Sequence, residues 1–311
     1  GSQEIEGRQR ILMNKKEYKK TYEANKANAN YTHLIRFESA IIFILCILLT
    51  LICLLPFVIV VVNATRDHGE ISRSVSLIPS THLIENIKNL STPEMKRTFD
   101  AFVGYKNSAI ITISATVLSV FFSALTAYGL CVYDFKLKDA ATTFILAVLM
   151  VPTQVSGVGF IKFMLAIDLY NNFLPLIIPA IAAPATVFYM RQYIRSAFPL
   201  EIVEAARIDG CGELRTFVTI GLPMIKPAIG VQAIFTFIAN WNNFYTPSMI
   251  ITSYQKMTLP MMIKKLSSDR LATDYGKIYC GIAISIVPLI IAYCCLSKYI
   301  VAGVALGGVQ E

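Results

Sequence analysis

Six long stretches of the chain contain no Asp, Glu, Lys or Arg and consist mostly of apolar residues. A helix that crosses a bilayer needs about 20 apolar residues, so each stretch predicts one spanning helix after its polar ends are trimmed. The pattern therefore predicts an all-α membrane protein whose two termini lie on the same side of the bilayer. The six predicted spans cover residues 39–63, 107–133, 140–161, 169–190, 227–252 and 278–297.

Two segments precede the first predicted span. Residues 1–12 contain Ile5-Glu6-Gly7-Arg8, which matches a protease cleavage site commonly added to recombinant proteins. We therefore expect residues 1–12 to be a tag and the native chain to begin at Met13. Residues 13–38 are polar and basic, which predicts a cytoplasmic tail. The membrane domain then occupies residues 39–311.

The composition supports a bilayer protein and adds an orientation. The chain has 311 residues, of which 55% are hydrophobic and 15% are charged, an apolar balance for a soluble domain. Its net charge of +8 comes from basic residues scattered through tails and loops, which predicts contact with anionic lipid headgroups and no nucleic-acid partner. Basic residues slightly favour the side of the N-terminal tail, so we expect both termini in the cytoplasm.

The cysteines and histidines do not predict a metal site. Seven cysteines lie mostly within the apolar stretches, and the three histidines are far apart in the sequence. None of these residues has the spacing of a zinc site. We interpret the cysteines as small apolar side chains.

The longest loop and the prolines add detail to the predicted bundle. In the loop of residues 64–106, apolar residues recur at helical spacing, which predicts a short amphipathic helix near the outer surface, with a folded linker as the alternative. Prolines in or beside the later spans predict kinks, either around a cavity or simply for packing. The apolar residues that predict this helix are Leu83, Ile84, Ile87 and Leu90. The prolines are Pro152, Pro175, Pro179, Pro184, Pro247 and Pro288.

The fifth predicted span contains an unusual polar group near its middle. Its sequence is Asn240-Trp241-Asn242-Asn243-Phe244-Tyr245. Amides inside a spanning helix are costly unless they are paired, so they either join helices or contact a ligand. Amides beside aromatic rings are typical of carbohydrate sites, and Ser156 could add a hydroxyl. The candidate substrate-path residues are Gln154, Tyr189, Asn240, Trp241, Asn242, Asn243 and Tyr245.

A polar island between the fourth and fifth spans carries a second pattern. From Pro199 the residues predict a short helix, with acidic residues in its first turn and Gly210 placed to end it in a left-handed turn. Ile202, Ala205 and Ala206 share one smooth face of this helix. A second helical run from about Glu213 is expected to stop near Pro223. The island is either a connector on the membrane surface or a docking site for another protein.

The spacing of this island resembles the EAA loop of ABC-importer permeases. Glu204-Ala205-Ala206 is followed, at the family's spacing, by Gly210 and by Ile220-x-Leu222-Pro223. The resemblance implies a type I ABC importer permease fold, with residues 191–226 as a coupling loop. It further implies a cytoplasmic coupling helix that docks on an ATPase through Glu204, Ala205, Ala206, Asp209 and Gly210.

The resemblance covers roughly residues 40–311 and is strongest to the shorter permease subunit of maltose-type and multiple-sugar importers. One departure concerns Asn243, where the family usually has Asp. The resemblance implies a second homologous permease, two cytoplasmic ATPase subunits and an extracytoplasmic sugar-binding protein. It places the loop of about 253–277 toward the binding protein and residues 302–311 between the ATPases. The expected location is the bacterial cytoplasmic membrane.

The chain itself is not expected to be an enzyme. It has no G-x-x-x-x-G-K-[ST] loop to hold phosphates, so ATP and Mg²⁺ are expected on the partner ATPase and no cofactor on this chain. The alternatives are a stand-alone secondary transporter, an importer of a solute other than sugar, a membrane-embedded enzyme, and a structural or signalling subunit. The charge-free stretches disfavour the secondary transporter, which usually carries ionisable residues within the membrane.

Overall fold

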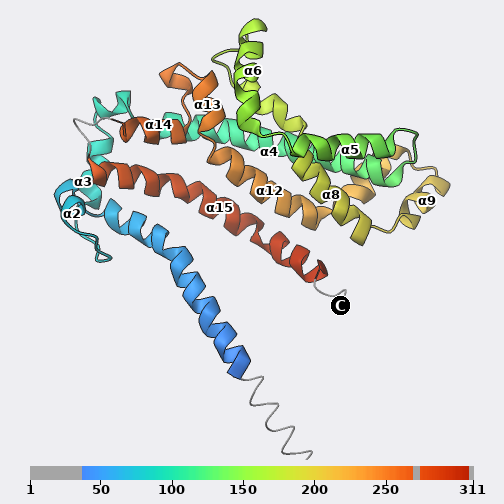
Figure 1. Cartoon of the computed structure of the whole chain (residues 1–311), viewed down its shortest axis with the longest axis horizontal. Coiled ribbons are helices and arrows are strands. Elements are labelled where there is room, and N and C mark those ends of the chain that lie inside the picture. The colour runs from blue at the N-terminus through green and yellow to red at the C-terminus, as the bar shows by residue number, and fades with distance from the viewer. Residues whose placement is uncertain (1–36, 269–273, 308–311) are drawn as a thin grey trace, which may run out of the picture. The chain divides into compact units, whose positions relative to one another are not determined.

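The computed structural model describes residues 37–268 and 274–307, without the side chains of 153–155 and 298–307. The predictions for the tag and for nearly all of the N-terminal tail lie outside these residues. Within the described residues every regular element is helical and there is no strand, as the sequence predicts (Figure 1). Residues up to Ile59 and residues from Val60 onward form two units.

The helices of the second unit follow one another through short connections. The bounds, in chain order, are α2 His68–Arg73, α3 Leu83–Leu90, η1 Met95–Arg97, α4 Ala101–Val132, α5 Lys138–Leu149, α6 Thr153–Ala166, α7 Leu174–Ile177, η2 Ile178–Ile181, α8 Pro184–Ala197, α9 Glu201–Ile208, α10 Glu213–Thr216, the π-helix η3 Phe217–Gly221, α11 Leu222–Met224, α12 Lys226–Trp241, α13 Tyr245–Ile250, η4 Tyr254–Lys256, α14 Leu259–Leu266 and α15 Tyr275–Gly307.

Four helical segments in the described part of the chain are long and apolar enough to cross a membrane. They are Phe37–Ala64, Met95–Val132, Leu174–Ala197 and Tyr275–Ser297. A fifth is counted if Glu213–Met224 and Lys226–Trp241, which meet at 78°, form one bent span. The structure therefore supports a multi-spanning membrane protein, while the predicted total of six spans stays a prediction.

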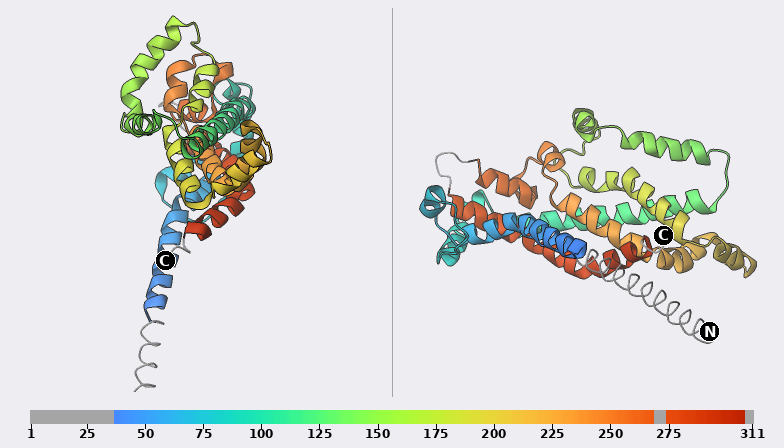
Figure 2. Two further views of the ribbon diagram at one scale, coloured as in Figure 1. Left: turned by 90° about the vertical axis from the view of Figure 1, so that its right-hand side faces the viewer. Right: turned by 60° about the horizontal axis from the view of Figure 1, so that its bottom comes forward.

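Two predicted spans are broken rather than continuous. The predicted span 140–161 consists of α5 and α6, which run in different directions (Figures 1 and 2). Pro152 lies between them, and a proline lacks the N–H that a continuous helix needs. The predicted span 227–252 ends early, because α12 stops at Trp241 and α13 begins at Tyr245. The Asn243 side chain accepts a hydrogen bond from Thr246 N at 3.3 Å, a local bond that competes with helix continuation.

The long helix α4 forms the centre of the second unit. Asp100 caps its first turn by accepting hydrogen bonds from Phe102 N at 3.0 Å and Val103 N at 3.2 Å. Small side chains on its buried face, such as Ala115 and Ala124, allow neighbouring helices to approach closely. The helices α8, α12 and α14 pack against α4, and α15 packs against the other side of α12 (Figure 1).

The loop between the first helix and α4 has a fixed internal structure. It contains α3, which confirms the amphipathic helix expected at these residues. The buried guanidinium of Arg66 donates to Glu70 O at 2.8 Å and to Ser74 O at 3.0 Å. The amide of Asn86 on α3 donates to Ala64 O at 2.9 Å and to Arg66 O at 3.0 Å. These hydrogen bonds satisfy the buried backbone oxygens of the loop.

Candidate functional site

The helix α9 corresponds to the expected coupling helix, and it is attached to the protein by one face only. Val203 and Ala206 are buried, and Val203 belongs to an apolar cluster with Ile194 and Phe217. The opposite side is exposed and carries Ile208, which is 87% exposed. Within the described residues, the outer side of α9 is therefore uncovered.

The smooth face expected from the sequence lines a groove beside α9. Ile202, Ala205 and Ala206 form one wall of this groove, although Ala206 is mostly buried. The groove has a volume of about 530 Å³. Asp209 and Gly210 also line it, whereas Glu204 is exposed but does not. The far wall is formed by Cys211, Arg215, Thr219 and Ile220.

Gly210 ends α9 in the conformation that the sequence predicts. Its φ angle is +75°, in the left-handed region that favours glycine. Gly210 N donates to Arg207 O at 3.0 Å, and Cys211 N donates to Ala206 O at 2.9 Å. A Cβ atom at Gly210 would meet nothing within 4 Å. Only the backbone conformation, and not lack of space, therefore requires glycine at this position.

A group of three side chains joins α9 to the next helix and to the end of α4. Arg207 Nε donates to Glu213 Oε1 at 2.7 Å, and the hydroxyl of Tyr133 donates to Glu213 Oε2 at 2.6 Å. The Arg207 guanidinium lies over the Tyr133 ring, 5.6 Å from its centroid, a favourable cation–π geometry. Sequence reasoning missed this group, because Arg207 and Glu213 meet only after the chain reverses at Gly210.

The electrostatics of these three side chains reinforce the contact. The hydrogen bonds from Arg207 and Tyr133 lower the pKa of the Glu213 carboxyl below its ordinary value. Burial, followed by the hydrogen bond to Glu213, raises the pKa of Tyr133 to about 12. At neutral pH the Glu213 carboxyl is therefore ionised and accepts both hydrogen bonds, while the Tyr133 hydroxyl keeps the proton that it donates.

The second half of the loop is packed tightly against α4. Gly221, at the end of the π-helix η3, lies so close to Tyr128 that an added Cβ would be 3.1 Å from the Tyr128 ring. The rings of Tyr128 and Phe217 are 5.1 Å apart, and both residues are buried. The chain then turns by 78° into α12. The loop that contains α9 and η3 is thus joined to α4 through packed side chains and leads directly into α12.

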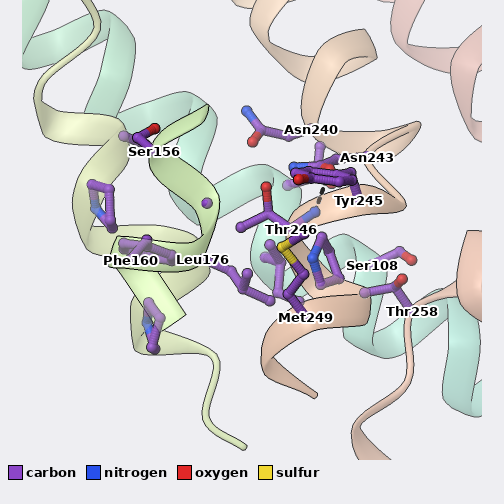
Figure 3. A pocket seen from close by; sticks show the side chains of 17 residues that line it. Ser108, Ser156, Phe160, Leu176, Asn240, Asn243, Tyr245, Thr246, Met249 and Thr258 are labelled. Carbon is purple, nitrogen blue, oxygen red and sulfur yellow. Dashed lines mark hydrogen bonds between the residues drawn. The ribbon is translucent and has the colours of Figure 1, made fainter. Parts of the chain in front are cut away.

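At the other end of α12 the structure contains a cavity of about 330 Å³ (Figure 3). Its walls come from α4, α6, the α7–η2 segment, the end of α12, the interruption that follows it, and α13, with Thr258 just before α14. The hydroxyls of Thr112 and Thr258 are buried there and make no hydrogen bond within the described residues. The cavity is lined by Ser108, Ile111, Thr112, Ser156, Gly157, Phe160, Pro175, Leu176, Pro179, Ala180, Asn240, Asn243, Tyr245, Thr246, Pro247, Met249 and Thr258.

Three of the predicted substrate-path residues meet in this cavity. Asn240, Asn243 and Tyr245 lie together on one side of it, and Ser156 lies across from them (Figure 3). Asn240 Nδ2 donates to Thr236 O at 2.9 Å. Sequence reasoning missed the hydroxyls that α4 contributes to the cavity, because serine and threonine residues such as Ser108 and Thr112 are also common in the packed faces of membrane helices.

Other predicted residues lie elsewhere. The Trp241 side chain is 3% exposed, its Nε1 donates to Ser285 O at 3.1 Å, and its ring stacks on Phe237 at 5.8 Å. It therefore packs in the core and does not line the cavity. Asn242 is exposed outside the cavity, and Tyr189 lines a separate groove at the opposite end of the helices. The side chain of Gln154 lies outside the described residues.

The described residues contain no group of three or more His, Cys, Asp or Glu side chains that could hold a metal ion. All seven cysteines are free thiols, of which Cys280 is buried. The polar side chains that line the cavity carry hydroxyls and amides, and Phe160 and Tyr245 add aromatic rings.

Comparisons with known proteins show the family of the chain. Residues 119–305 match the family described as "Binding-protein-dependent transport system inner membrane component". The chain is 34% identical to an arabinooligosaccharides transport system permease protein of Halalkalibacterium halodurans, over 76% of this chain and 88% of that protein. It is 31% identical to a diacetylchitobiose uptake system permease protein of Streptomyces coelicolor, over 86% of this chain and 88% of that protein.

A solved structure has the same fold. The structure is that of a bacterial ABC transporter involved in the import of the acidic polysaccharide alginate. The TM-score is 0.72 at 20% identity, over 85% of this chain and 97% of the matched chain. The likeness shows the fold, and the family match with the relatives shows that the chain belongs to the inner membrane components of binding-protein-dependent ABC transport systems.

Proposed function

We propose that this chain is a permease subunit of an ATP-driven importer that receives an oligosaccharide from an extracytoplasmic binding protein. The chain forms half of the translocation pore, and a second, homologous permease forms the other half. Two cytoplasmic ATPase subunits bind ATP and Mg²⁺ and drive the cycle, while this chain carries no catalytic group. The complex lies in the bacterial cytoplasmic membrane, surrounded by lipid.

The observation that carries this proposal is the connection between α9 and the cavity. The groove beside α9 is exposed, as a docking site must be, and α12 runs from the coupling loop to the cavity at Asn240. The contacts of Gly221 and Phe217 with Tyr128 hold the loop against the helices. A displacement of α9 would therefore be passed to α12 and to the cavity wall.

The proposed topology places the coupling loop in the cytoplasm and counts six spans. The α5–α6 pair and the α12–α13 pair each make one broken span in this topology. Broken helices are tolerated in a membrane when they line a cavity, and Asn243, at the α12–α13 break, and Ser156, on α6 beyond the α5–α6 break, both line the cavity in this protein. The N- and C-termini then face the cytoplasm.

The mechanism is a change between inward-open and outward-open states. ATP closes the partner dimer, which moves α9 through Glu204, Ala205, Ala206, Asp209 and Gly210. The closed dimer shifts the equilibrium only because it binds the two states of the permease differently. The second half of the proposed cycle returns the cavity to the inward-open state after hydrolysis.

The proposed substrate class rests on the cavity and on the relatives. Asn240 and Asn243 offer amides, Thr112 and Thr258 offer hydroxyls, and Tyr245 offers an aromatic ring. Sugars require hydrogen bonds to their hydroxyls and an apolar surface for their C–H faces. The names of the relatives reported above refer to arabinooligosaccharides and diacetylchitobiose, which supports an oligosaccharide as the substrate here.

The proposal is tested in vesicles that contain the two permeases and the ATPases, with the binding protein outside. Uptake of labelled oligosaccharides is measured with ATP inside, and again with an ion gradient in place of ATP. ATP-dependent sugar uptake is the expected result. Uptake driven by the gradient alone would indicate a secondary transporter. ATP-dependent uptake of other solutes but of no sugar would indicate the non-sugar importer.

A further inference from the structure

A pocket that the proposed transport cycle does not use lies between α4, α5 and α8, at the coupling-loop end of these helices. Its volume is about 460 Å³. Lys138 and Asp139 from the start of α5 line it, together with Arg191 and Arg195, which lie one turn apart on α8. Its remaining walls are mainly apolar and include Leu130.

The positive charges in this pocket are not neutralised. Lys138, Arg191 and Arg195 share the pocket with one acidic side chain, Asp139, which leaves an excess of two positive charges. Within the described part of the chain, no ion pair involves any of these cations. The Nε atom of Arg191 is fully buried and donates to no acceptor among the described residues. Because an unsatisfied buried donor is unfavourable, an acceptor from outside the described residues would stabilise this atom.

The pocket lies where apolar helices give way to polar loops. Arg191 directly follows the charge-free stretch that ends at Met190, and Lys138 lies just before the stretch that begins at residue 140. The Cys131 thiol on α4 donates a hydrogen bond to Arg191 O at 3.8 Å. Cys131 lies close to the end of a third charge-free stretch. In a membrane protein this level corresponds to the lipid headgroups.

We propose that this pocket binds an anionic phosphate group, carried by a phospholipid headgroup. An arginine guanidinium offers paired N–H donors that match phosphate oxygens, and Arg191 and Arg195 present two of them side by side on α8. Basic pockets between membrane helices are suited to lipid headgroups. The apolar wall at Leu130 gives room for the start of an acyl chain. The lipid then joins α5 to α8, two helices that border the moving parts of the permease.

The test uses the full-length chain in detergent, freed of lipid and titrated with one probe at a time. The probes are phosphatidylglycerol, phosphatidylethanolamine and inorganic phosphate, and native mass spectrometry reports the bound fraction. The test variant is R191Q/R195Q, with R191K/R195K as the conservative pair. The matched control is Lys136→Gln, which removes a positive charge from an exposed side chain that does not line the pocket.

The wild type and the Lys136→Gln control are expected to bind phosphatidylglycerol with the same affinity. R191Q/R195Q should bind it at least about tenfold more weakly, because two charge-assisted contacts are lost. The affinity of R191K/R195K for phosphatidylglycerol should lie between those of the wild type and R191Q/R195Q, since lysine keeps the charge but not the paired donors. Phosphatidylethanolamine should bind more weakly than phosphatidylglycerol to the wild type. If inorganic phosphate binds equally well, and only when the arginines are present, the pocket takes phosphate from solution.

Several results would overturn the proposal. The proposal is wrong if the wild type and R191Q/R195Q bind phosphatidylglycerol with equal affinity. It is also wrong if Lys136→Gln loses as much affinity for phosphatidylglycerol as R191Q/R195Q, because that result would indicate a general charge effect. If R191Q/R195Q does not fold, as judged by gel filtration, Arg195→Gln alone is compared with Lys136→Gln, because Arg195 is exposed. If no phosphate probe binds but the assembled importer dissociates in R191Q/R195Q, the pocket accepts a carboxylate of a partner subunit instead.

Discussion

Arg207 Nε donates to the carboxylate of Glu213 at 2.7 Å across the turn that Gly210 closes. The two residues thus fix the angle between α9 and α10, and the Tyr133 hydroxyl extends the contact to α4. All three are near the surface, so their role is geometric rather than a large contribution to stability. In the proposed cycle, this group keeps α9 in line with the helices that it moves.

Replacement of Glu213 by glutamine should weaken the transmission of movement. Glutamine keeps an acceptor for Arg207 but loses the charge, so the angle between α9 and α10 becomes less fixed. We expect less sugar taken up per ATP hydrolysed in reconstituted vesicles, with a loss below about tenfold, because exposed ion pairs are weak. Glu201→Gln on α9 is the control, since Glu201 forms no ion pair within the described residues. Equal behaviour of the two variants would refute this role.

Acidification should remove the contribution of the same carboxylate. The pKa of Glu213 is lowered in the folded protein, so its contribution to stability is present above the ordinary pKa of 4.5 and is lost as the pH falls through the lowered value. The melting temperatures of the wild type and Glu213→Gln should therefore differ at pH 7 and converge toward pH 3. A difference that does not change over this range would show that Glu213 contributes through packing only.

The sequence predicts the features of this protein that depend on local rules. The helix at Leu83–Leu90 follows from apolar residues at helical spacing. The left-handed turn at Gly210 follows from a glycine directly after such a pattern. The contact of Arg207 with Glu213 could not be predicted in this way, because it depends on the direction in which the chain leaves Gly210.

The cavity was predicted in part for a related reason. The sequence indicates that the amides of the fifth span are unusual, but not how α12 is rotated or where it ends. That rotation turns Asn240 toward the cavity and Trp241 toward Ser285 in the core. The prolines predict a kink at Pro152, where α5 and α6 are interrupted. The interruption beside Asn243 escaped prediction, because a charge-free stretch looks the same whether its helix is continuous or broken.

The two neighbouring asparagines offer a matched test of the cavity. Asn243 lines the cavity, whereas Asn242 is exposed outside it. Asn243→Ala should raise the half-saturating concentration of the sugar roughly two- to tenfold, the effect of losing one hydrogen bond of about 0.5–1.5 kcal/mol. Asn242→Ala should leave it unchanged. Uptake titrations in vesicles would contradict this placement if the two variants had equal effects or if only Asn242→Ala had one.

Asn171 should stabilise the wall of the cavity next to α13. Its φ angle is +54°, its Oδ1 accepts hydrogen bonds from Thr252 N at 3.2 Å and Ser253 N at 3.1 Å, and its Nδ2 donates to Ser253 Oγ at 2.6 Å. Asn171→Ala loses these bonds and places alanine in the left-handed region, which should cost about 2–4 kcal/mol.

Asn171→Asp is the control for this prediction, because aspartate tolerates the same conformation and keeps the oxygen that accepts both backbone N–H groups. It should therefore be clearly more stable than Asn171→Ala in thermal melts of the purified protein. Equal melting temperatures for the two variants would argue against the hydrogen bonds of the Oδ1 atom.

The most direct test of the account compares Gly210→Val with Gly212→Val in the reconstituted importer. An added Cβ meets nothing within 4 Å at either position, but Gly210 has a φ angle of +75° and Gly212 has one of −70°, which valine adopts readily. Gly210→Val should reduce ATP-driven sugar uptake by about tenfold or more, together with the ATPase activity that the binding protein stimulates, while Gly212→Val retains both. Full uptake and stimulated ATPase activity in Gly210→Val would contradict the claim that α9 and its left-handed turn couple ATP hydrolysis to transport.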